Sequence, residues 1–110
     1  MNKQSKALSY LGLAMRAGKL AFGDEGVLGA VRSGQARLVV LAEDASDNTR
    51  KKFQDKCRHY NVELFECFNR YELGGAIGKE ARVLVAVLDS GFAQMIRPCF
   101  VKPPEVEPIE

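Results

Sequence analysis

The segment Gly23-Asp24-Glu25-Gly26 has the residue types best suited to binding chemistry in this chain. Two glycines stand at the start of a short apolar stripe, a pattern that predicts a bend followed by a helix. The first N–H groups of a helix lack partners within the helix and lie at the positive end of its dipole. The segment therefore predicts a site for a phosphate group or a sharply folded RNA.

Two other segments invite an enzymatic interpretation that their residues do not support. Residues 74–80 resemble a phosphate-binding P-loop, which needs four residues between its glycines and a Ser or Thr after its Lys. Only three residues separate the glycines here, and Glu80 holds the hydroxyl position. Glu43 and Asp44 are adjacent at the end of an apolar run, so their side chains point in opposite directions. We expect Asp44 to cap a turn or to accept hydrogen bonds from basic side chains nearby.

The remaining polar residues form no pattern typical of catalysis or metal binding. His59 is the only histidine in the sequence and has no nucleophile at a suitable place. Cys57, Cys67 and Cys99 are odd in number, widely spaced and without a C-x-x-C pair, so neither a zinc site nor a disulfide framework is predicted. We expect a protein that is not an enzyme and that uses no cofactor or metal.

The composition predicts one small, mildly basic domain. The chain has 110 residues and a formal net charge of +2, and three of its fourteen acidic residues lie in the run 102–110. Residues 1–101 hold fifteen bases and eleven acids, a net charge of +4, which permits phosphate contacts. We predict a single domain over residues 1–101 and a flexible acidic tail over residues 102–110. The sequence shows no signal-peptide or membrane-spanning pattern, so we expect a cytoplasmic protein with reduced thiols.

Apolar periodicity predicts alternating helices and strands. Helices are expected over residues 6–16, from Gly23 to an end near Ser33-Gly34, from a cap at Ser46 through Tyr60, over residues 71–77, and from Phe92 to a stop near Pro98. Strands are expected over residues 19–22, 38–42, 62–68 and 83–88. The third helix should bury one face made of Phe53, Cys57 and Tyr60. Its cations are interpreted as a solvated surface rather than as phosphate contacts: Arg50, Lys51, Lys52, Lys56 and Arg58.

Two of the expected strands are predicted to lie at the centre of the sheet. The runs 38–42 and 83–88 are continuously apolar and rich in β-branched residues, which is typical of strands covered on both faces. We expect both to be central and parallel. Repeated strand–helix units then predict an α/β fold, a three-layer α/β/α sandwich around a mixed, largely parallel four-stranded sheet.

Several of these motifs, taken together in order and spacing, resemble the ribosomal L7Ae/L30e family and, within it, the small bacterial YlxQ-like proteins. The resemblance extends over residues 11 to 93. It rests on Gly23 with its helix, Ala42-Glu43-Asp44 at a strand end, Glu72-Leu73-Gly74 within residues 69–74, and Gly78-Lys79-Glu80-Ala81.

The resemblance implies an α/β/α protein that binds kink-turn RNA, a helix–bulge–helix element bent at tandem sheared G·A pairs. Family members place a loop and a helix N-terminus in the opened major groove, and a second loop covers the bulged bases. The resemblance brings no catalysis. The matched positions are Gly23 in the first loop, Asp44 at the strand end, Arg70 before Glu72-Leu73-Gly74, and Lys79, Glu80 and Ala81 in the second loop.

The first loop departs from the pattern of the family's best-known RNA binders, which is Gly-x-Asn-Glu followed three residues later by Lys. With Gly23 and Gly34 in register, the Asn, Glu and Lys positions hold Glu25, Gly26 and Gly29. A shift by one residue pairs Asp24-Glu25 with Asn-Glu, but it needs a deletion before Gly34 and leaves Leu28 at the Lys position. The first alignment loses base and phosphate contacts unless other cations replace them, the candidates being Lys19, Arg32 and Lys79.

Two positions near these loops also have structural interpretations. Gly29 inside a helix costs about 1 kcal/mol relative to Ala, which close approach of an RNA backbone or of a neighbouring helix would explain. Arg70 and Tyr71 can be interpreted equally well as an RNA-binding pair or as a surface cation and a packed ring, respectively.

Two functions from different classes fit these residues. The first is a non-catalytic RNA-binding protein, ribosome-associated or bound to a structured regulatory RNA, whose partner is a kink-turn or ribosomal RNA and neither DNA nor a membrane. The second is a protein-interaction module that has lost kink-turn recognition. The RNA-binding residues predicted under the first function are Gly23, Asp24, Glu25, Gly26, Gly29, Arg32, Asp44, Arg70, Lys79, Glu80, Ala81 and Arg82.

Overall fold

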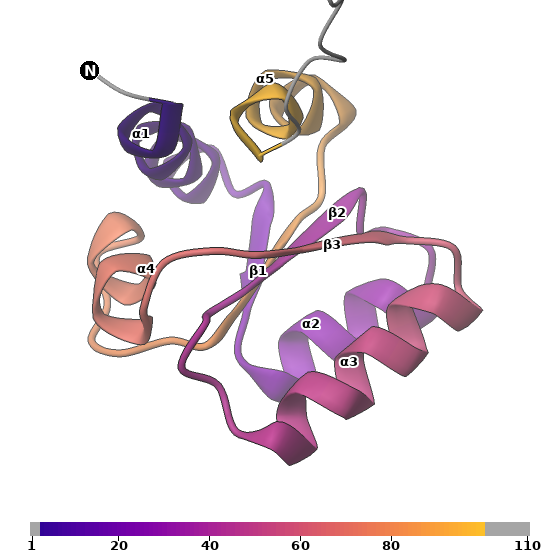
Figure 1. Ribbon diagram of the computed structural model, residues 1–110. Coiled ribbons are helices and arrows are strands. Elements are labelled where there is room, and N and C mark those ends of the chain that lie inside the picture. Colours follow the sequence, from indigo (N-terminus) through magenta and orange to yellow (C-terminus); the bar gives the residue numbers. More distant parts are fainter. Residues whose placement is uncertain (1–2, 101–110) are drawn as a thin grey trace, which may run out of the picture.

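Five helices and four strands are present in the computed structural model, which describes residues 3–100 (Figure 1). In chain order they are α1 (Lys3–Arg16), β1 (Leu20–Phe22), α2 (Asp24–Arg32), β2 (Leu38–Leu41), α3 (Asp47–His59), β3 (Glu63–Glu66), α4 (Arg70–Ala76), β4 (Leu84–Val87) and α5 (Ser90–Phe100). Helices and strands alternate, as the apolar pattern predicted. The predicted acidic tail lies outside the described residues. None of the described helices is long and apolar enough to cross a membrane.

The sheet is mixed and has the strand order β1-β4-β2-β3. Its central strands are β2 and β4, as their continuous apolar runs predicted, and every residue of both is buried. The prediction that these two strands are parallel, in a largely parallel sheet, is wrong. β4 pairs antiparallel with both β1 and β2, and only β2 and β3 are parallel. A continuous apolar run indicates burial on both faces, whereas strand direction depends on the connections, so the run could not decide it.

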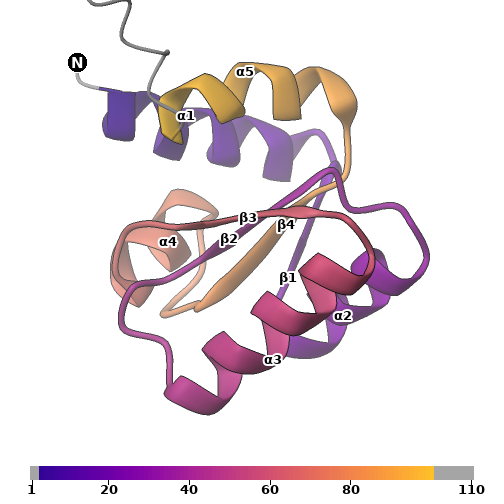
Figure 2. The same cartoon turned by 45° about the vertical axis from the view of Figure 1, so that its right-hand side comes forward.

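Helices cover both faces of the sheet, which gives the three predicted layers (Figures 1 and 2). On one face, α1, α4 and α5 contribute Leu11, Leu73 and Ile96 to a core with alternate residues of β2 and β4. On the other face, α2 and α3 contribute Val31 and Phe53 to a second core with the remaining residues of those strands. Because successive strand residues point to opposite faces, each apolar run supplies both cores.

The strand directions bring four chain segments to one edge of the sheet. Phe22 at the end of β1 lies opposite Val85, and Leu41 at the end of β2 lies opposite Leu84 of β4 and Glu66 of β3. The carboxyl ends of β1, β2 and β3 therefore meet the amino end of β4. We call this the loop edge, and it carries the β1–α2 turn, residues 42–46, residues 67–70 and residues 77–83.

Two helix predictions need correction. α5 extends to Phe100, two residues beyond the Pro98 near which a stop was predicted, and the ring of Phe100 stacks on Phe65 with centroids 5.0 Å apart. That aromatic packing holds the last turn beyond the proline. α3 ends at His59, and Tyr60 is its C-cap, with 40% of its surface exposed rather than buried. The helical spacing would have buried Tyr60 only if the helix had continued through it.

Candidate nucleic-acid interface

The β1–α2 turn is built around Gly23, which is the N-cap of α2. Gly23 has a φ of +81°, a conformation that residues with side chains rarely adopt, so a glycine is favoured there. Its N–H donates to the carbonyl of Leu84 at 3.0 Å, and its own carbonyl accepts from the N–H of Val27 at 3.0 Å. These bonds fix the N-terminus of α2 against β4, with Asp24 and Glu25 exposed in its first turn.

Two cations from the segment between α4 and β4 lie over the ring of Phe22, the residue before that turn. The Nζ atom of Lys79 and the Cζ atom of Arg82 are each 5.4 Å from the ring centroid. Cation–π contacts of this length place both side chains beside the N-terminus of α2. The apolar pattern assigned Phe22 only to a strand, although an aromatic ring directly before the loop glycine was a signal that could have revealed its role.

Gly74 allows the segment that carries Lys79 to pack directly on α4. A Cβ atom at Gly74 would lie 1.4 Å from the carbonyl oxygen of Glu80 and 2.6 Å from its carbonyl carbon. The N–H of Lys79 donates to the carbonyl of Gly74 at 2.9 Å. Residues 74–80 are thus the end of a helix and a tightly packed loop, whereas a P-loop follows a strand.

Asp44 and Arg70 bind each other across the loop edge. The backbone N–H of Arg70 donates to Oδ1 of Asp44 at 2.9 Å, its Nε donates to Oδ2 at 3.2 Å, and its Nη2 donates to the Asp44 carbonyl at 2.6 Å. The carbonyl of Arg70 accepts from the N–H of Arg82 at 2.9 Å. Asp44 therefore has the hydrogen-bond acceptor role that its position predicted. Its carboxylate also offsets the charge of Arg70, which leaves Lys79 and Arg82 as the cations of the edge that lack such a partner among the described ion pairs.

A capping box starts α4 beside this pair. Oδ1 of Asn69 accepts from the N–H groups of Tyr71 and Glu72 at 2.9 and 2.8 Å, and the Glu72 carboxylate accepts from the N–H of Asn69 at 3.0 Å. The Asn-x-x-Glu spacing in the sequence could have predicted this cap. Tyr71 is 71% exposed, so its interpretation as a packed ring is wrong. The first turn of α4, directly after the loop edge, therefore has an exposed aromatic side chain.

Two of the cations considered as replacements for the missing family Lys lie away from the loop edge. Arg32 ends α2, after which the chain enters β2 at Leu38 on the opposite edge of the sheet. Lys19 directly precedes β1, and its carbonyl accepts from the N–H of Leu88 just after β4. The nine residues of α2 span about 12 Å from Asp24 to Arg32. Of Lys19, Arg32 and Lys79, only Lys79 lies at the loop edge.

The two glycines inside α2 face outward. A Cβ atom at Gly26 would make an ordinary 3.9 Å contact with Cβ of Ala21, and one at Gly29 would have no described atom within 4 Å. Both residues are exposed. Packing against a neighbouring helix within residues 3–100 therefore does not explain Gly29, and this side of α2 is open to a partner.

The described residues offer little for cofactor or thiol chemistry. No group of three or more His, Cys, Asp or Glu side chains within residues 3–100 is placed to hold a metal ion. Cys57 and Cys67 are buried and free, and burial raises the pKa of the Cys57 thiol to about 11. Such a thiol stays protonated near neutral pH and is a poor nucleophile.

The sequence model of one known family matches residues 5–96. The chain belongs to the ribosomal protein L7Ae/L30e/S12e/Gadd45 family. The resemblance drawn from the loop-edge motifs is thereby confirmed, and so is the prediction that the chain is not an enzyme.

Bacterial members of this family are similar over most of both chains. The RNA-binding protein YlxQ of Bacillus subtilis (strain 168) is 51% identical over 86 residues, which cover 78% of this chain and 86% of that protein. The RNA-binding protein YlxQ of Enterococcus faecium is 45% identical over 93 residues, which cover 84% of this chain and 88% of that protein. The large ribosomal subunit protein eL30B of Schizosaccharomyces pombe is 32% identical over 95 residues, covering 80% and 77%. The identities to the two YlxQ proteins confirm the predicted resemblance to the YlxQ-like bacterial branch.

Solved structures share the fold. A protein of unknown function from Bacillus halodurans C has a TM-score of 0.83 at 45% identity, with 86% of this chain and 96% of that chain covered. The 15.5kD RNA binding protein of Giardia lamblia has a TM-score of 0.76 at 17% identity, with 89% and 84% covered. The second likeness shows the three-layer fold alone.

Proposed function

We propose that this family member is a cytoplasmic, non-catalytic RNA-binding protein that recognises a structured RNA of the kink-turn or ribosomal type. The RNA contacts the loop edge. Residues 23–26 at the start of α2 enter the RNA groove, and residues 79–82 lie along the backbone and the bulged bases. The YlxQ relatives are named as RNA-binding proteins, which supports this proposal.

The observation that carries the proposal is the pair of cations on Phe22 beside the start of α2. Lys79 and Arg82 are held there by the same ring, at 5.4 Å each. Their charges suit phosphates, and the first N–H groups of α2 suit acceptors on phosphates or base edges. The Glu25 carboxylate accepts hydrogen bonds but cannot donate them, so it suits the amino groups of base edges.

Arg70 acts differently from Lys79 in this arrangement. Its guanidinium is bonded to Asp44, with 39% of its side chain exposed, so it mainly holds the start of α4 against the β2–α3 turn. Arg70→Ala is therefore expected to weaken RNA binding because the start of α4 is no longer held in place. It should flatten the salt dependence less than Lys79→Ala does.

The test is a titration of a fluorescein-labelled kink-turn RNA at several salt concentrations. Lys79→Ala removes an uncompensated cation from the loop edge, and Lys19→Ala removes an exposed cation from the opposite edge as a matched control. We expect Lys79→Ala to lower the affinity several-fold and to reduce the slope of log K against log salt by about 1. Lys19→Ala should leave both unchanged. Wild-type affinity in Lys79→Ala would rule out the loop edge as the RNA site.

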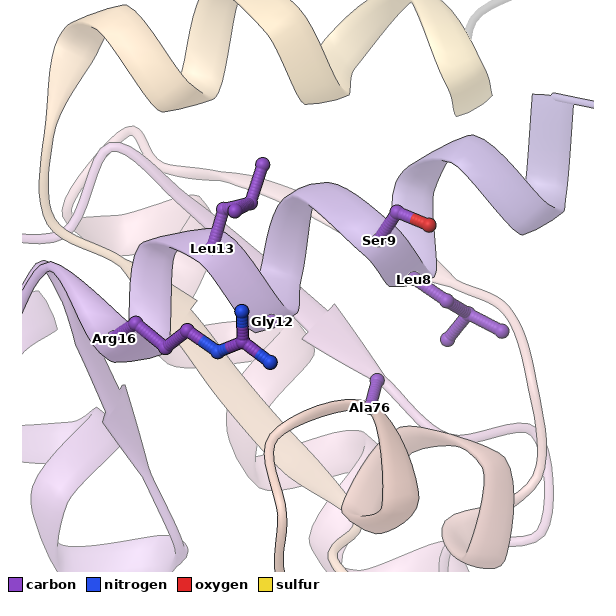
Figure 3. Close-up of a pocket in the computed structure, with 6 residues that line it drawn as sticks. All are labelled: Leu8, Ser9, Gly12, Leu13, Arg16 and Ala76. Carbon is purple, nitrogen blue, oxygen red and sulfur yellow. The ribbon is translucent and has the colours of Figure 1, made fainter.

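One observation favours the alternative role as a protein-interaction module. A groove of about 480 Å³ lies between α1 and α4, lined by Leu8, Ser9, Gly12, Leu13, Arg16 and Ala76 (Figure 3). Leu13 is 46% exposed at this groove. An exposed apolar groove suits a protein partner. The same titration separates the two roles, because a protein-interaction module would give RNA binding that does not depend on Lys79.

A further inference from the structure

The outward side of α3 carries a strongly basic surface outside the loop edge. The segment 50–59 contains a single acidic residue, Asp55. Its basic residues are Arg50, Lys51, Lys52, Lys56 and Arg58, followed by His59.

Arg50 is the cation of this surface that is bonded to neighbouring acids. Its Nε donates to the Glu66 carboxylate at 2.7 Å, and its Nη1 donates to the Asp47 carboxylate at 3.2 Å. Its Nη2 also donates to the backbone carbonyl of Glu43 at 2.8 Å. Within residues 3–100, every ion pair involves Arg50, Arg70 or Arg97. Among the described residues, none of the other four cations of the α3 surface has a paired carboxylate, and the Nζ atom of Lys52 lies 5.7 Å from the centroid of the Phe53 ring.

An open hollow lies at the C-terminal end of this surface. It has a volume of about 570 Å³ and is lined by Lys52, Asp55, Lys56, His59 and Tyr60. The rings of His59 and Tyr60 meet edge to face, with centroids 4.8 Å apart and planes at 87°. Tyr60 is 40% exposed. Exposed aromatic rings of this kind are surfaces on which a nucleobase can stack.

The helix dipole explains only part of this arrangement. Lys56, Arg58 and His59 lie in the last turn of α3, where cations stabilise the negative end of a helix. That effect does not account for Lys52 one turn earlier or for the exposed ring of Tyr60. Rings combined with unpaired lysines are the elements that bind single-stranded RNA, since the rings stack on bases and the lysines attract phosphates.

We propose that this hollow is a second RNA contact, which binds an unpaired nucleotide of a single-stranded segment. The base stacks on the exposed ring of Tyr60, which the ring of His59 meets edge to face. Lys52 and Lys56 contact the flanking phosphates, and Asp55 accepts a hydrogen bond from a base amino group or a ribose 2′-hydroxyl. The inference builds on the proposed RNA binding at the loop edge. α3 begins just after the loop edge and its 13 residues extend about 18 Å, so one RNA with a single-stranded extension can reach both sites.

The first test compares two fluorescein-labelled probes on the full chain. One probe is a short oligouridylate without secondary structure, and the other is a kink-turn RNA without a single-stranded extension. The double variant Lys52→Ala/Lys56→Ala is expected to bind the oligouridylate about tenfold more weakly and the kink-turn RNA with wild-type affinity. Lys79→Ala is expected to show the opposite pattern.

A second pair of variants isolates the stacking contact. Tyr60→Phe keeps the ring and should retain oligouridylate binding, whereas Tyr60→Leu should lower the affinity for the oligouridylate about tenfold. Both replacements leave the backbone cap of α3 intact, because Tyr60 caps through its N–H to the Lys56 carbonyl at 3.0 Å.

The outcomes separate the second contact from the proposed function. Unchanged oligouridylate affinity in the lysine double variant, or equal losses on both probes, would overturn the second contact. Equal affinities of Tyr60→Phe and Tyr60→Leu would overturn the stacking role. Failure of the wild-type chain to bind kink-turn RNA would instead overturn the proposed function, and the oligouridylate comparison would still decide the α3 hollow.

Discussion

Gly29 is the residue where the RNA-binding proposal can be tested by adding a contact rather than removing one. The position is exposed, and a Cβ atom there would have no described neighbour within 4 Å, so a longer side chain fits without rearrangement. In the alignment that keeps Gly23 and Gly34 in register, it also holds the place of the family's lysine. A lysine there lies on the open side of α2.

Gly29→Lys is expected to raise RNA affinity several-fold and to steepen the salt dependence by about one phosphate contact. Gly29→Ala is the matched control, because it supplies the same gain in helix propensity without the charge. Both variants should unfold at a higher urea concentration, because their free energy of unfolding should rise by up to about 1 kcal/mol. If the two variants bind RNA equally, position 29 does not face the RNA.

At the loop edge, the role of a side chain was predictable where the residues next to it in the sequence indicate that role, but its partner was not. Asp44 after an apolar run predicted an acceptor, and its bonds to Arg70 agree with that role. The position of Phe22 before the loop glycine was a visible signal, but its contact with Lys79 joins residues far apart in the chain, and no local pattern identifies that partner. The sequence left the role of Tyr71 open, because helical spacing does not say which face of a two-turn helix meets the core.

At the scale of elements, the packing of residues 77–83 on α4 decides where Lys79 lies. Two successive glycines of α4 provide a test. A Cβ atom at Gly74 would collide with the Glu80 carbonyl at 1.4 Å, whereas one at Gly75 would have no described neighbour within 4 Å.

Gly74→Ala is expected to destabilise the protein by about 1–3 kcal/mol or more, because the segment must move away from α4. The displaced Lys79 should also weaken RNA binding. Gly75→Ala, the matched control, should stabilise α4 by up to about 1 kcal/mol and leave RNA affinity unchanged. Urea denaturation and RNA titration measure the two effects. A Gly74→Ala variant as stable as wild type would contradict the close packing.

The element pattern was predictable because buried strands and amphipathic helices have different apolar periods. The direction of β4 was not, since its neighbours on both sides run antiparallel to it. That direction matters for the site, because it brings the start of β4 and the preceding Lys79 to the edge where β1 and β2 end.

At the scale of the whole molecule, two cores on opposite faces of the sheet support the loop edge. Cys57 belongs to the core under α2 and α3, with 2% of its surface exposed. Burial raises the pKa of its thiol from the usual value near 9 to about 11. The folded state therefore retains this proton at a pH where the unfolded chain has lost it.

The contribution of this thiol to stability is complete below pH 9 and is lost as the pH rises toward about 11. The free energy of unfolding should fall over that interval by about 2–3 kcal/mol more in the wild type than in Cys57→Ala. Urea denaturation at a series of pH values measures the difference. Parallel pH profiles for the two proteins would show that the thiol ionises freely in the folded state.

The measurement that tests the central claim most directly compares two RNAs on the wild-type chain. One is a fluorescent kink-turn RNA, and the other is the same RNA with its tandem G·A pairs replaced by Watson–Crick pairs, both titrated at several salt concentrations. The account predicts tighter binding of the kink-turn RNA, with the preference lost on replacement of the G·A pairs. Weak, salt-sensitive binding that is equal for both RNAs would contradict it.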